Sequence, residues 1–229
     1  MRMVLIVATS ALVAGCSATA GDEQRPSSAP TTSSPSATVS TISKAPGTRT
    51  SAPNTPPATG TAIADVIRWI EAARPADVGA YHSVTRDGVT TDLGDQVAFI
   101  TAGTETNCLT NRYQDGALSC LVKLTNPPPR PPGIETGWKN NWVDFVGTSV
   151  DVGSPHGDPG PFGDGTGAEL PSGQSLAFGD YRCRADAGAV FCVNYAHQTA
   201  VKLSAAGVGG FGCLREATPP AGIGLRLSC

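Results

Sequence analysis

The sequence has few aromatic residues, few charged residues and no excess of positive charge. Aromatic residues make up 6% of the 229 residues and charged residues make up 15%. The formal net charge is -3, so the chain lacks the basic surface typical of nucleic-acid binding, and we expect no nucleic-acid partner. Glycine (27) and proline (19) are too frequent for a long coiled coil or an all-helical bundle.

The sequence also lacks the motifs of common catalytic and metal sites. It contains no G-x-S-x-G, no H-E-x-x-H and no C-x-x-C. Its three histidines, His82, His156 and His197, are widely separated, although a Ser-His-Asp set can still assemble in space. The acidic residues between 158 and 169 do not have the spacing of a calcium loop. We therefore expect no enzyme activity, no cofactor and no metal ion.

The N-terminus has the pattern of a bacterial lipoprotein precursor. Arg2 precedes an apolar stretch, Met3–Val13, that is too short to span a bilayer but has the length of a signal-peptide core. Small residues at Ala14 and Gly15 then precede Cys16, as in a lipobox. We predict that residues 1–15 are a cleaved signal peptide and that Cys16 carries the lipid. The alternative is an ordinary signal peptide with a chance cysteine.

Residues 16–62 are predicted to form a tether. From Ser17 to Ala62, the chain contains 19 Ser or Thr, 7 Pro and no aromatic side chain. Such a segment cannot bury enough apolar surface to offset the entropy of ordering, so we predict that it is disordered and a candidate for O-glycosylation. The tether would link a globular β-rich domain, residues 63–229, to the outer face of the cell membrane. The lipid anchor is the predicted membrane contact.

Six cysteines follow Cys16, at positions Cys108, Cys120, Cys183, Cys192, Cys213 and Cys229. Export to an oxidising compartment and the even number predict three disulfides. A metal site is the alternative, but no histidine lies near a cysteine at ligand spacing.

We predict that the cysteines pair in sequence order, as Cys108–Cys120, Cys183–Cys192 and Cys213–Cys229. The middle pair has the strongest basis. A hairpin that turns at Ala187-Gly188 places Cys183 opposite Cys192 at a non-hydrogen-bonded position, where Cα atoms lie ~4.5 Å apart.

The domain is predicted to be mainly β (α+β): a small antiparallel disulfide-stapled β domain with one N-terminal helix. Thr61 is the expected cap of that helix, and Arg74-Pro75 its end. One helical stripe is formed by Ile63, Val66, Ile67 and Ile70. Alternation predicts a strand over 116–124 with an upstream partner beginning at 97–101 and continuing past 107–108. Further strands are predicted at 141–146, 149–152, 175–178, 181–184, 190–195 and 199–203.

A glycine-rich segment, 207–212, fits G-x-G-x-x-G. A dinucleotide fingerprint also needs a helix and an acidic residue downstream, but Cys213 follows at once and Pro219-Pro220 leaves almost no room for a helix. We predict a glycine-rich loop at this position.

Two long loops are predicted between Asn126 and Gly167, and they are the expected recognition surface if the domain has one. Four of their side chains have the area or chemistry for a possible ligand contact: Trp138, Trp142, His156 and Phe162. The alternative is that the loops cap an open end of the sheet and bury both tryptophans.

Five segments have a more specific pattern: Asp65–Glu71, Tyr81–Gly94, Trp142–Phe145, His156–Phe162 and Leu176–Asp186. They resemble the LppI family of mycobacterial lipoproteins. The resemblance covers most of the chain after the tether. It implies a membrane-attached envelope lipoprotein and brings no catalytic residue with it.

The sequence therefore favours a non-enzymatic binding or structural module that is anchored to the membrane. Its partner would be an envelope lipid, a glycan or a protein. The alternative is an envelope hydrolase with an unrecognised active site. A deep cavity lined by histidine and carboxylate would favour the hydrolase, and a mostly apolar cavity would favour a lipid carrier.

Overall fold

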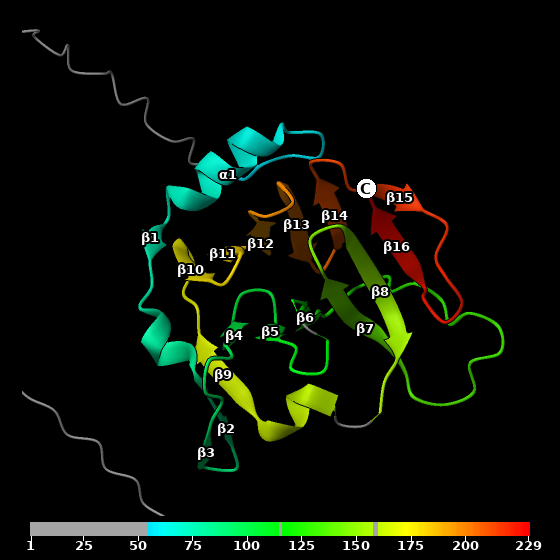
Figure 1. Cartoon of the computed structure of the whole chain (residues 1–229), viewed down its shortest axis with the longest axis horizontal. Helices are drawn as coiled ribbons and strands as arrows, with labels where there is room; N and C mark the ends of the chain where they lie inside the picture. Colours follow the sequence, from blue (N-terminus) through cyan, green and yellow to red (C-terminus); the bar gives the residue numbers. More distant parts are fainter. Residues whose placement is uncertain (1–54, 115, 158–159) are drawn as a thin grey trace, which may run out of the picture. The chain divides into compact units, whose positions relative to one another are not determined.

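The structure, a computed structural model, describes residues 55–114, 116–157 and 160–229. The predicted signal peptide, Cys16 and the tether up to residue 54 lie outside the described residues. The described domain is mainly β, as predicted, with one α-helix, two sheets and three cysteine pairs at disulfide distance (Figure 1). In the part of the chain that the structure describes, no helix is long and apolar enough to cross a membrane.

Helix α1 (Ile63–Glu71) covers one face of the first sheet, where it contacts strands β11, β12 and β13 (Figure 1). Its apolar stripe buries Val66 and Ile70, and Trp69 packs edge-on against Phe191 with ring centroids 4.8 Å apart. Thr61 does not cap the helix, contrary to the prediction. Ala62 occupies that position, and the Thr61 hydroxyl donates backward to the Ala58 carbonyl.

The first sheet has six strands in the order β1-β10-β11-β12-β13-β14. Their bounds are β1 (Arg74–Pro75), β10 (Gln174–Phe178), β11 (Tyr181–Asp186), β12 (Ala189–Asn194), β13 (Thr199–Ser204) and β14 (Gly207–Phe211). The prediction of a loop at 207–212 was wrong, because β14 pairs antiparallel with β13 along its whole length. Hydrogen bonds to β13 hold the glycines in a strand although glycine has a low strand propensity.

The second sheet has ten strands in the order β15-β16-β8-β7-β6-β5-β4-β9-β2-β3. Their bounds are β2 (Ser83–Arg86), β3 (Val89–Asp92), β4 (Ala98–Thr101), β5 (Thr106–Thr110), β6 (Leu118–Leu121), β7 (Trp138–Phe145), β8 (Ser149–Pro155), β9 (Thr166–Glu169), β15 (Arg215–Ala217) and β16 (Leu225–Ser228). Two 3-10 helices, η1 (Val78–Tyr81) and η2 (Gly160–Asp164), lie between strands.

Strands β7 and β8 occupy more of the 126–167 region than predicted. β7 begins at Trp138 and β8 extends to Pro155, so Trp138 lies in a strand and not in a loop. The two strands pair with a register shift between Lys139 and Val143, which breaks the simple alternation that sequence reasoning requires.

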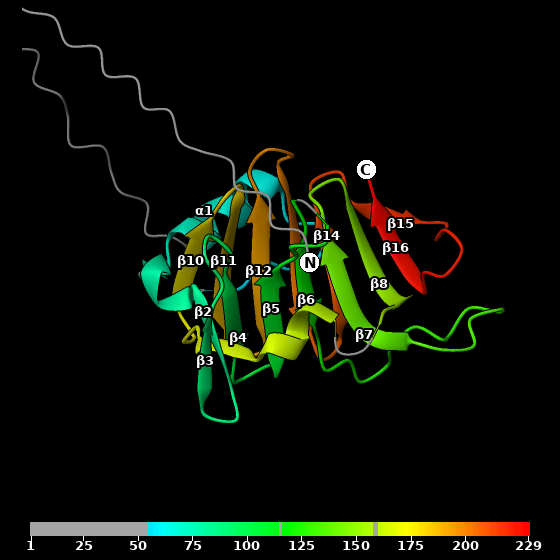
Figure 2. The same ribbon diagram turned by 60° about the horizontal axis from the view of Figure 1, so that its bottom comes forward.

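The main core lies between the two sheets, which Figure 2 shows as facing layers. Each sheet contributes one cross-strand disulfide to this core: Cys108–Cys120 joins β5 to β6, and Cys183–Cys192 joins β11 to β12. The third disulfide, Cys213–Cys229, lies outside it at exposed positions. These are the three pairs expected from sequence order, and Asp186 pairs with Ala189 across the predicted turn.

Candidate functional site

Three of the four predicted ligand-contact residues come together on the outer face of the ten-stranded sheet. The His156 ring stacks on the Trp142 ring with centroids 3.6 Å apart, and Phe162 packs edge-on against Trp142 at 4.9 Å. Trp142 is only 2% exposed. This tryptophan is therefore a packing residue, which the alternative interpretation predicted for both tryptophans. Within the aromatic cluster, His156 and Phe162 retain partial exposure.

The fourth residue, Trp138, packs elsewhere. A Cβ atom built on Gly153 would lie 2.8 Å from its ring, and one built on Gly224 would lie 3.0 Å away. Pro128 lies beside the same two glycines. Trp138 is half-buried between these segments, so its ring holds the 122–137 loop against β8 and the segment before β16.

A row of polar side chains runs across the same sheet next to the aromatic cluster. Ser119, Asp144, Asp151 and Arg226 are directly opposite one another on four neighbouring strands. Asp144 accepts hydrogen bonds from the Ser119 hydroxyl and from the Trp142 indole nitrogen, the latter at 2.9 Å. Asp151 forms a two-point ion pair with Arg226, at 2.6 Å for both contacts.

Burial controls the ionisation of this cluster. It raises the pKa of the Asp144 carboxyl above its usual value, although the hydrogen bonds from Ser119 and Trp142 act in the opposite direction. Burial also lowers the pKa of His156, and the nearby Asp144 carboxylate only partly offsets this effect. His156 is therefore neutral at pH 7 in the folded protein.

Ser154, His156 and Asp144 lie close together, but they do not form a catalytic triad. The Ser154 hydroxyl lies 2.7 Å from Nε2 of His156, and an Asp144 oxygen lies 3.8 Å from the same nitrogen. A triad needs the carboxylate on the other ring nitrogen, where it orients the base. Ser154 is also buried. The cluster therefore supports packing and hydrogen bonding in preference to nucleophilic attack.

We expect His156 to make the stability of the domain sensitive to acid. Because its pKa is lower in the folded than in the unfolded chain, the stability that it contributes is complete above about pH 6.5 and is lost as pH falls through the folded-state value. His156→Gln should remove this loss. Urea unfolding at pH 7.5 and at pH values below 6.5 measures the effect as a change in the pH slope.

Asp144→Asn is the companion variant. It keeps an acceptor for Ser119 and Trp142 but removes the charge that favours protonated His156, so the acid-dependent loss should become larger than in the unmodified chain. Equal pH slopes in the unmodified chain and in His156→Gln would contradict the assignment.

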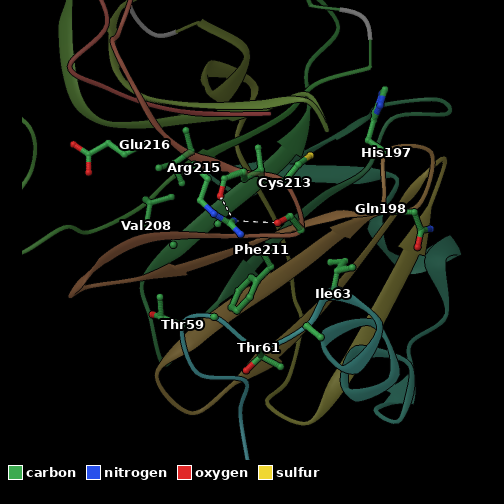
Figure 3. A pocket seen from close by; sticks show the side chains of 17 residues that line it. Thr59, Thr61, Ile63, His197, Gln198, Val208, Phe211, Cys213, Arg215 and Glu216 are labelled. Carbon is green, nitrogen blue, oxygen red and sulfur yellow. Dashed lines mark hydrogen bonds between the residues drawn. The ribbon is translucent and has the colours of Figure 1, made fainter.

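A cavity also lies along strand β14, outside the predicted loops. This cavity, the β14 groove, has a volume of about 700 Å³ (Figure 3). One wall is the N-terminal arm, residues 59–63, and the other is the segment 212–216. Val208, Gly209, Gly210 and Phe211 form its floor, with His197, Gln198 and Leu227 at its margins.

The glycines create this groove. A Cβ atom on Gly209 would find only the Cβ of Lys202, at 4.0 Å, so the space above the strand is empty. At Gly210, by contrast, there is no space for a side chain, because a Cβ would lie 2.7 Å from the Cβ of Leu214. The repeated glycines after a strand were the sequence signal for this site, but their assignment to a loop concealed it.

The guanidinium group of Arg215 lies in the lining of the groove. Arg215 points toward Phe211 in Figure 3 and donates through Nη1 to the carbonyls of Gly212 at 3.0 Å and Leu214 at 2.7 Å. Glu216, next in the chain, points away. Because two backbone carbonyls hold the guanidinium, its position is fixed before any ligand arrives.

A second cavity, of about 680 Å³, opens where several strands of both sheets end. Several of its polar groups already have partners within the protein. The Tyr181 hydroxyl contacts the carbonyls of Gly116 at 2.6 Å and Phe145 at 2.8 Å, and Arg112 pairs with Asp164 at 3.0 Å. Burial raises the pKa of Tyr181 to about 12, so the phenol stays protonated. These groups therefore support the fold at this end of the sheets.

Within residues 55–114, 116–157 and 160–229, no group of three or more His, Cys, Asp or Glu side chains is placed to hold a metal ion. The chain matches no protein-family model, no curated protein and no solved structure.

Proposed function

We propose that this chain is a lipid-anchored envelope protein that binds a partner in the β14 groove and catalyses no reaction. The groove carries this proposal. Its volume is in the range of protein ligand sites, and its floor of glycine backbone leaves main-chain groups accessible. It contains a fixed cation, Arg215, to orient a ligand.

The N-terminal sequence supports the location. Residues 1–15 have the pattern of a lipoprotein signal peptide, and Cys16 follows small residues at the expected position. The resemblance to the LppI family favours the same placement, on the outer face of the cell membrane. Two or three acyl chains on Cys16 would anchor the chain without any membrane-spanning helix.

The hydrolase alternative has one supporting observation, the contact between Ser154 and His156. The position of Asp144 on the same imidazole nitrogen argues against it, as does the burial of the serine. Catalysis would require Asp144 to move to the other imidazole nitrogen and Ser154 to become accessible, whereas the binding hypothesis requires neither change.

Native mass spectrometry of the mature chain, purified from its own membrane, tests the proposal. We expect the mass of a diacylglyceryl group on Cys16 and a co-purifying ligand. Gly209→Val should abolish ligand retention because the side chain enters the open space of the groove without a steric clash. Ala102→Val, at an exposed turn position, is the control. An unmodified Cys16, or equal ligand retention in Gly209→Val, would refute the corresponding half of the proposal.

A further inference from the structure

The outer edge of β14 has backbone groups that β13 does not use. Gly207 directly follows the two-residue turn Ala205-Ala206, so it forms a hydrogen-bonded pair with β13. Hydrogen-bonded and non-hydrogen-bonded pairs then alternate along an antiparallel ladder. Val208 and Gly210 therefore direct their N–H and C=O groups away from β13. Since β14 is the last strand of its sheet, these four groups face the groove.

The edge also lacks the features that usually prevent strand addition. Natural edge strands are commonly blocked by proline, by charged side chains or by a bulge. β14 contains glycine at 207, 209 and 210, and it contains no proline and no charged residue. Its pairing with β13 is continuous over five residues. A second extended chain can therefore approach the backbone of β14 closely.

The position of Arg215 defines the end of this open edge and its charge preference. The guanidinium donates a hydrogen bond to the Gly212 carbonyl, so that carbonyl is not available to a partner strand. The free backbone groups of the edge are therefore those of Val208 and Gly210. Both partners of Arg215 are neutral carbonyls, and within the described residues no carboxylate pairs with it. A guanidinium has five N–H donors, so donors remain for an acidic group in the groove.

We propose that the β14 groove binds an extended acidic segment of a partner protein, which adds to the six-stranded sheet as a further strand. Backbone hydrogen bonds to Val208 and Gly210 hold the segment, and Arg215 pairs with a glutamate or aspartate side chain in it. This inference rests on the proposed binding function of the groove and specifies the chemical class of its ligand.

The test uses the full mature chain and two acetylated, amidated ten-residue peptides of alternating valine and threonine. One peptide carries a central glutamate and the other a glutamine at the same position. We expect the glutamate peptide to bind about tenfold more tightly, which is the ratio for a contribution of about 1.4 kcal/mol from a charged hydrogen bond. Amide hydrogen exchange should show new protection at Val208 and Gly210 and little change at Gly209, which already bonds to β13.

Two pairs of variants separate the contribution of the backbone hydrogen bonds from that of the Arg215 charge. Val208→Pro removes an outward N–H without removing a bond to β13, and it should weaken both peptides, whereas Val208→Thr keeps the N–H and should bind as the unmodified chain does. Arg215→Gln should remove the preference for glutamate. Arg130→Gln should leave it unchanged, because the guanidinium of Arg130 also donates to two backbone carbonyls but does not line the groove. Thermal unfolding establishes that each variant is folded. If Val208→Pro does not fold, the comparison of Arg215→Gln with its control variant and the pattern of amide hydrogen exchange still test the inference.

Failure of both peptides to bind, or new protection only at residues outside β14, would overturn the inference. Peptide binding that Arg215→Gln leaves unchanged would overturn the charge preference. A non-peptide ligand that co-purifies with the unmodified chain and is lost in Gly209→Val would keep the binding function of the groove and reject the peptide as its ligand.

Discussion

Gly167→Ala is expected to lower the free energy of unfolding by about 3 kcal/mol or more, because the new methyl group meets main-chain atoms that cannot move independently. A Cβ on Gly167 would overlap the carbonyl group of Ala98 and lie 2.6 Å from the backbone nitrogen of Phe99. Gly167 lies in β9, which pairs with β2 on one side and with β4 on the other. Through β9, the hairpin of β2 and β3 joins the rest of the ten-stranded sheet.

Gly167→Ala should therefore weaken the β2–β3 hairpin locally and also lower the free energy of unfolding of the whole domain. The small cluster of Val84, Ala98 and Leu109 lies at this junction, so hydrogen exchange should increase first in β2 and β3. Urea unfolding measures the total effect. Gly188→Ala is the matched control, because a Cβ there has no neighbour within 4 Å, and the change should stay within about 0.5 kcal/mol. Equal stability of the two variants would contradict the steric explanation.

Removal of the core disulfide by Cys183→Ala and Cys192→Ala together should destabilise the domain by about 4 kcal/mol. Loop closure over a sequence separation of 9 accounts for about 3 kcal/mol of this in the chain-entropy treatment. Both cysteines are fully buried between central strands of the six-stranded sheet, so loss of the sulfur atoms also leaves a cavity that costs about 1 kcal/mol. Thermal and urea unfolding of the double variant measure the sum.

The exposed disulfide provides the comparison. Cys213→Ser with Cys229→Ser opens a longer loop, with a sequence separation of 16, but leaves no cavity in the core. The entropic cost should be about 3 kcal/mol, slightly above that of the shorter loop. A larger loss for this exposed pair than for the core pair would show that burial of Cys183 and Cys192 adds nothing.

The sequence by itself determined the features that depend on neighbours in the chain. The stripe from Ile63 to Ile70 defines a helix because residues three and four apart share a face. The turn at Ala187-Gly188 determines the register of β11 and β12, and with it the Cys183–Cys192 pair, because side chains alternate with period two. In each case the residues that contact one another are close in the sequence, so local geometry alone determines how they meet.

Only the tertiary structure decided which distant segments share a surface. Ser119, Asp144 and Asp151 form one row because the strands of their sheet stack in register, and no local periodicity encodes that register. The same applies to the groove, where the arm at 59–63 meets β14 and the segment 212–216. Glycine has little strand propensity, so the sequence favoured a loop at 207–212; pairing with β13 supplied the hydrogen bonds that made it an edge strand, and those bonds exist only once the sheet has formed.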